Sequence, residues 1–175
     1  MRNKSRIAVD AGMTLSLLFL MSYGLISEKA HEWIGLLIFA LFILHHVLNQ
    51  KWLAAVPRGR YNWMRTVQTV LAALILLCML GSAASGVILS RYVFTWLSFR
   101  GLVSAARKVH MLCAYWGYAL MSAHLGLHWG MISARLRQRV HFPDKILRAV
   151  GLAAAIYGVC AFYKRSIWQY MFLIS

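Results

Sequence analysis

Long runs of apolar residues dominate the chain, and short polar segments separate them. Each run is about as long as the roughly 20 residues that a helix needs to cross the hydrocarbon core of a bilayer. The fifth run is shorter, and the apolar tail at residues 167–174 would continue it. The pattern predicts an all-α integral membrane protein that forms one domain over residues 1–175. Five membrane-spanning helices are expected: residues 7–27, 30–48, 66–89, 109–132 and 146–162.

Composition agrees with a membrane location. The chain of 175 residues is 61% hydrophobic and 13% charged, with a mean hydropathy of +0.63, whereas a soluble domain is nearer half apolar and a quarter charged. The net charge of +15 is of the size found in nucleic-acid-binding proteins, but the basic residues lie between the apolar runs. We therefore expect contacts with lipid headgroups and no nucleic-acid partner.

The distribution of Lys and Arg predicts the orientation in the membrane. With a cytoplasmic N-terminus, 12 Lys and Arg residues lie on the cytoplasmic side and 7 on the other side, in agreement with the positive-inside rule. The first run is too long for the apolar region of a cleavable signal peptide, and it lacks a small-residue cleavage site. We expect a protein of the bacterial cytoplasmic (inner) membrane with its C-terminus outside.

The cysteines do not form a recognisable motif. Cys78, Cys113 and Cys160 lie singly within apolar runs, and the sequence contains neither CxxC nor CxxCH. We therefore expect neither a disulfide framework nor a covalently attached c-type haem.

Histidines carry the most informative spacing. His31 and His45 are 14 residues apart, and so are His110 and His124. Fourteen residues rise about 21 Å along a helix and leave two side chains about 40° apart, on one face. A left-handed bundle with a 3.5-residue period aligns them more closely. Six of the seven histidines lie in or at the edges of runs two and four: His31, His45, His46, His110, His124 and His128.

Equal spacing on two parallel helices predicts two sites. Runs two and four are separated by one helix, so we expect His31 level with His110 on the outer side and His45 level with His124 on the cytoplasmic side. Zinc normally takes four ligands, and about 21 Å of helix keeps the two levels apart. A haem needs only two axial ligands, so we predict two haem b groups in a four-helix bundle followed by a C-terminal helix. A histidine that merely hydrogen-bonds between helices does not explain two equally spaced pairs.

Several other residues are secondary candidates. His46 points about 100° away from His45 and is the rival ligand at that level. His128, one turn beyond His124, is a candidate contact for a haem propionate or a quinone, with an ordinary interfacial histidine as the alternative. Three basic residues at the outer level would neutralise propionates or bind lipid headgroups: Arg91, Arg107 and Lys108.

Two further features bear on helix packing. Asp10 is a carboxylate within the first apolar run, near its cytoplasmic end, and we expect it to pair with a neighbouring base rather than to join a proton path. Four glycines in runs one and three would let helices pack closely or let a porphyrin edge approach, and packing is favoured: Gly12, Gly24, Gly81 and Gly86.

Three segments resemble a known family. HEWIGLLIFALFILHHVLN (residues 31–49), GVILSRYVF (86–94) and ARKVHMLCAYWGYALMSAHLGLHW (106–129) are similar to the flavinylation-associated cytochromes, also catalogued as the DUF4405 domain. The resemblance implies a haem-binding membrane protein that often works with extracytoplasmic domains carrying covalent FMN. It also implies His31, His45, His110 and His124 as the haem ligands. The 14-residue spacing is also similar to that in the b-type subunit of quinol:cytochrome c reductases, but the quinone-site loops of that subunit are not matched.

These patterns predict transmembrane electron transfer. Electrons would pass between a quinol or cytoplasmic-side donor and an extracytoplasmic flavoprotein or haem protein, in either direction, and the chain would be the membrane subunit of an oxidoreductase complex. The alternatives are a haem- or metal-handling transporter, which needs broken helices at mid-membrane, and a redox-inert anchor subunit.

Overall fold

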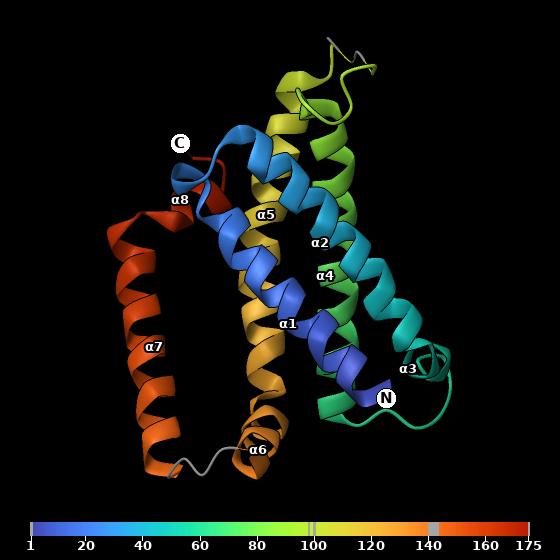
Figure 1. The fold of residues 1–175 in the computed structure, drawn as a ribbon, viewed down its shortest axis with the longest axis vertical. Helices are drawn as coiled ribbons and strands as arrows, with labels where there is room; N and C mark the ends of the chain where they lie inside the picture. The colour runs from blue at the N-terminus through green and yellow to red at the C-terminus, as the bar shows by residue number, and fades with distance from the viewer. Residues whose placement is uncertain (1, 98, 100, 140–143, 175) are drawn as a thin grey trace.

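The computed structural model describes residues 2–97, 99, 101–139 and 144–174, and this part of the chain is helical without strands (Figure 1). A short 3₁₀ turn, Tyr23–Leu25, follows the first helix. The α-helices are α1 (Arg2–Met21), α2 (Glu28–Leu48), α3 (Gln50–Ala55), α4 (Trp63–Leu89), α5 (Val103–Leu127), α6 (Trp129–Arg139), α7 (Asp144–Lys164) and α8 (Ile167–Met171).

Two of these helices are long and apolar enough to cross a bilayer, judged among the described residues: α2 and α4. Only 11% and 17% of their most apolar segments are buried, whereas a core helix of a soluble protein is mostly buried. The protein is therefore an all-helical chain with two candidate membrane-spanning helices. The expected number of five is not supported by this criterion.

The other three expected spans are helical but more polar. α1, α5 and α7 have 20, 25 and 21 residues. Lys4, Arg6 and Asp10 lie in α1, while α5 carries Arg107 and Lys108 together with two imidazoles. Charged groups and imidazoles lower the mean hydropathy of a helix that is otherwise apolar.

α4 and α5 form the most extensively packed pair of helices, and α1 lies along α2 (Figure 1). Small residues bring α4 and α5 together. A Cβ atom added at Gly81 would meet Sγ of Cys113 at 2.5 Å, and one at Gly117 would meet Cβ of Cys78 at 3.3 Å. The packing role expected for Gly81 is therefore observed, since a Cβ atom at this position would require the Cys113 side chain or the helices to move.

The core is small and lies where α1, α2 and α4 meet. Its buried side chains are Val9, Met13, Ile38, Phe42, Leu71 and Ile75. Many other large apolar side chains are exposed, among them Leu15, Phe19, Leu77 and Val150. Apolar exposure on this scale is unusual for a soluble monomer and fits a surface that faces lipid.

The C-terminal tail does not continue the fifth span. Ser166 adopts a left-handed backbone conformation (φ 50°), and the chain turns there between α7 and α8. α8 then packs on α5, where the indole Nε1–H of Trp116 donates to the carbonyl of Met171 (3.0 Å) and Tyr115 stacks on Tyr170. α7 stands apart from α5 in Figure 1. The expected extension through residues 167–174 was therefore wrong.

The connection after α4 is shorter than the sequence suggested. α5 begins at Val103, six residues before the expected start of the fourth span, so the connection runs from Ser90 to Leu102. Tyr92 and Trp96 are exposed there, as expected for aromatic residues at a membrane interface.

Candidate functional site

His31 and His110, here called the first pair, face each other from α2 and α5. Their ring centres are 6.2 Å apart and the ring planes are inclined by 67°. Tyr23 packs its ring edge against His31 on the side of the preceding turn, with ring centres 5.0 Å apart. The spacing argument expected these two histidines at one level, and the structure brings them together.

α4 holds the imidazole of His110. Nδ1 of His110 lies 3.1 Å from the carbonyl oxygen of Ser82 and 3.1 Å from Oγ of Ser85. A carbonyl oxygen only accepts hydrogen bonds, so Nδ1 carries the proton and Nε2 keeps its lone pair. Ser85 is buried (2% exposed) and donates to the carbonyl of Gly81 at 2.6 Å. Gly86 leaves room for the ring, because a Cβ there would lie 3.6 Å from Cε1 of His110.

The geometry of the first pair suits two axial ligands of one haem iron. An imidazole nitrogen binds a first-row metal at about 2 Å and lies about 1 Å from the ring centre, so two axial imidazoles have ring centres about 6 Å apart. The observed 6.2 Å agrees with this separation. Nδ1 of His31 is buried and has no hydrogen-bond partner among the described residues, which is costly unless the imidazole has another role.

His45 and His124, here called the second pair, lie farther along the same two helices. Nδ1 of His45 is 2.8 Å from Oδ1 of Asp10 on α1. His124 lies within electrostatic range of His45, His128 and Asp10, and its Nδ1 is buried without a partner in the described part of the chain. The expected pairing of Asp10 with a neighbouring base is confirmed, and that base is one of the candidate ligands.

α2 and α5 run in the same general direction (Figure 1). The rings of His31 and His110 are neighbours, whereas His45 and His124 make no ring contact or hydrogen bond with each other in the described residues. In Figure 1, α2 crosses α4 and α5 obliquely, and its C-terminal end lies to one side of α5. The structure thus brings the first pair into ring contact, while α1 contributes Asp10 beside the second pair.

His46, the rival of His45, is engaged locally. Its Nδ1–H donates to the carbonyl of Phe42 one turn earlier (2.9 Å), and its ring packs on the buried Phe42 ring with centres 4.3 Å apart. His45, in contrast, reaches a different helix. This arrangement favours His45 over His46 as the partner of His124.

The remaining candidates are placed as follows. Arg91 pairs with Glu28 (Nη1–Oε2, 3.3 Å), so its charge is already partly neutralised. Arg107 and Lys108 are exposed and have no hydrogen bond or ion pair among the described residues. His128 caps the C-terminal end of α5, and its ring packs against His124 with centres 4.8 Å apart.

A carboxylate beside the first pair was missed by sequence reasoning. Glu32 follows His31 and accepts hydrogen bonds from the Ser90 hydroxyl (2.7 Å) and from the backbone N–H groups of Arg91, Tyr92 and Val93 (2.7–3.0 Å). It therefore fixes the chain segment after α4 onto the start of α2. The available signal was an acidic residue adjacent to a candidate ligand at the edge of an apolar run. Ser82 and Ser85 were also missed, and small polar residues in an apolar run gave no specific signal.

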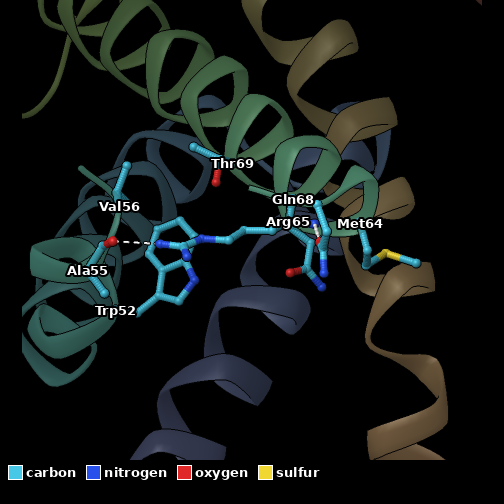
Figure 2. A pocket seen from close by; sticks show the side chains of 8 residues that line it. Trp52, Ala55, Val56, Met64, Arg65, Gln68 and Thr69 are labelled. Carbon is cyan, nitrogen blue, oxygen red and sulfur yellow. Dashed lines mark hydrogen bonds between the residues drawn. The ribbon is translucent and has the colours of Figure 1, made fainter. Parts of the chain in front are cut away.

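No metal-binding cluster and no histidine-lined cavity offers a second candidate site among the described residues. In the described residues, no group of three or more His, Cys, Asp and Glu side chains is arranged to hold a metal ion. A cavity of about 390 Å³ lies at the connection between α3 and α4 (Figure 2). Arg65 occupies its polar side and donates to the carbonyls of Ala55 and Arg58, both at 2.6 Å. This guanidinium shapes the connection, and the histidines do not line the cavity.

No protein family, no curated protein and no solved structure matches this chain.

Proposed function

We propose that the chain is a di-haem membrane cytochrome b that carries electrons across a bilayer. The observation that carries the proposal is the first pair: two imidazoles from parallel helices, 6.2 Å apart between ring centres, with Nδ1 of His110 protonated and bonded away from the partner ring. The same two helices present His45 and His124 fourteen residues later, about 21 Å along each axis.

Each residue has a defined task in this proposal. His31 and His110 bind one haem, and His45 and His124 bind the other. Ser82 and Ser85 hold the ring of His110 in the tautomer that offers Nε2 to a metal, as hydrogen-bond partners of metal-binding histidines do. A six-coordinate haem supplies reversible one-electron chemistry and leaves no open position for oxygen.

The proposal also covers the arrangement in the membrane. α1, α2, α4, α5 and α7 would be the five spans, with the N-terminus in the cytoplasm of a bacterium and the C-terminus outside, as the charge distribution favours. The first pair would then lie near the outer face and the second near the cytoplasmic face. The exposed Arg107 and Lys108 are available near the first pair for propionates or lipid phosphates.

The proposed partners follow from the family resemblance. A quinol or a cytoplasmic-side reductant would exchange electrons at the second pair, and an extracytoplasmic flavoprotein or haem protein would do so at the first. A transporter is less well supported, because α2 and α4 are unbroken helices, whereas transport sites usually need helices interrupted at mid-membrane.

Haem content tests the proposal directly. The full chain is expressed in membranes, purified in detergent and assayed for protein and for acid–acetone-extractable haem. We expect about two non-covalent haems per chain, both reducible and both with the optical spectrum of six-coordinate low-spin haem b. A preparation that binds no haem in cells supplied with haem would refute the proposal.

A further inference from the structure

The two pairs differ in what holds the ligand imidazole. Nδ1 of His110 faces neutral oxygens of Ser82 and Ser85, whereas Nδ1 of His45 faces the carboxylate of Asp10. We infer that Asp10 is a positioning residue for His45, which orients the imidazole and lowers the reduction potential of the haem at the second pair below that at the first. This inference rests on the proposed function, which supplies the two haems.

Asp10 acts on the second pair: its carboxylate hydrogen-bonds to His45 and lies within electrostatic range of His124. α1 lies along α2 (Figure 1), and the 2.8 Å separation of Oδ1 and Nδ1 is that of a charge-assisted hydrogen bond. In the described residues, the Asp10 carboxylate makes no other hydrogen bond or ion pair. Arg6, one turn earlier on α1, donates instead to the carbonyl of Leu48 (2.5 Å). The negative charge of Asp10 is therefore directed at the imidazole.

The hydrogen bond determines which nitrogen of His45 is free. In the neutral imidazole, an Nδ1–H that donates to the carboxylate leaves Nε2 without a proton, so Nε2 is the nitrogen available to a metal. The same bond fixes the rotation of the ring about its side chain. The neighbouring His46 bonds to its own helix at Phe42, so the carboxylate distinguishes the two adjacent histidines.

The bond also changes the donor strength of the ligand. An imidazole that donates to a carboxylate is more basic and donates more electron density to its metal, which stabilises oxidised iron over reduced iron and lowers the potential. Neutral partners at His110 have a weaker effect. With haem held at both pairs, this difference in potential would favour electron transfer from the second pair to the first, which would oxidise the second haem, reduce the first and change no bond or proton. The electron is supplied by the quinol or cytoplasmic-side reductant named above.

A redox titration of the purified full chain distinguishes this role from a purely structural one, in which the Asp10–His45 bond only holds α1 against α2. The haem lost in His45→Ala identifies the second site, and the haem lost in His31→Ala identifies the first. In the unmodified chain we expect the second site to have the lower potential. In Asp10→Asn, which keeps an oxygen acceptor but removes the charge, we expect the reduced-to-oxidised ratio of that haem at fixed potential to rise at least tenfold, or about 59 mV for one electron.

Glu28→Gln removes the same charge from an ion pair with Arg91 and should leave the second-site potential unchanged. Asp10→Glu should keep the potential low. If Asp10→Asn loses the haem, the two reduction potentials of the unmodified chain test the inference. A higher potential at the second site than at the first overturns it. Two bound haems with no shift in Asp10→Asn also overturn it, although the proposed function stands, whereas a chain without haem refutes the function itself.

Discussion

The two histidine pairs share one spacing but differ in how the fold supports them. Several contacts support the first pair: its rings are 6.2 Å apart, α4 holds His110, and Glu32 fixes the segment after α4 beside His31. The second pair has no ring contact in the described residues, and a single carboxylate from α1 supports it at His45. Equal sequence spacing therefore does not give equal environments, because a third helix completes each site and the third helices differ.

The largest effects are expected from removing a ligand. His110→Ala should lose the haem of the first pair, and His124→Ala should lose that of the second, so each variant retains about one haem per chain. Loss of both haems from either variant would contradict two independent sites, since each substitution removes a ligand from one pair only. The measurement is haem content together with a redox titration, which shows which haem remains.

Glu32→Gln should destabilise the region of the first pair. The carboxylate accepts from Ser90 and from three backbone N–H groups, and an amide places its NH₂ group where an acceptor is needed. We expect a loss of about 1–3 kcal/mol in the free energy of unfolding, measured by denaturant titration in detergent. Glu28→Gln, which affects an exposed ion pair, should cost less than about 1 kcal/mol. Equal losses would contradict a special role for Glu32.

Gly81→Ala tests the close packing of α4 on α5, which places Ser82 and Ser85 beside His110. The added Cβ would lie 2.5 Å from Sγ of Cys113, so the helices must separate at a cost of about 1–3 kcal/mol. Cys113→Ala removes the sulfur atom and should restore the stability of the double variant, since the remaining Cβ would lie 3.6 Å away. Thermal unfolding in detergent measures both. A double variant as unstable as Gly81→Ala would show that the sulfur contact is not the cause.

His46→Ala should have the smallest effect on haem binding. His46 bonds to the carbonyl of Phe42 and packs on the Phe42 ring, so its loss removes local packing but no proposed ligand. Both haems should remain, with unchanged spectra. If His46→Ala loses a haem while His45→Ala does not, the second pair consists of His46 and His124, and the role assigned to Asp10 is wrong.

Much of the helical arrangement was predictable, and the tertiary contacts at the sites were not. The apolar runs located α2 and α4 to within three residues at either end, and the 14-residue spacing placed His31 near His110. The early start of α5 was missed because Arg107 and Lys108 ended the apolar run, although charged residues are compatible with the first turns of a helix. Glu32, Ser82 and Ser85 were missed because their partners lie on other segments, and a hydrogen bond across helices leaves no periodic signal.

The turn before α8 was also unpredictable from hydropathy. Residues 167–174 are apolar enough to continue a span, but the chain turns at Ser166 and Trp116 on α5 donates a hydrogen bond to the carbonyl of Met171. Met171 is buried where α8 packs on α5, whereas Phe172 and Ile174 remain exposed. Hydropathy alone therefore predicts that a segment leaves water but not which apolar surface it contacts.

In the proposed function, His31 and His110 bind one haem together while His45 and His124 bind another. Comparison of His31→Ala, His110→Ala and the double variant that carries both substitutions tests it most directly. If the claim holds, all three retain the same single haem, with one potential and one spectrum, because removing the second ligand of an already lost site changes nothing further. Loss of different haems by the two single variants, or of both haems by the double variant, would contradict the pairing and the proposed route for electrons.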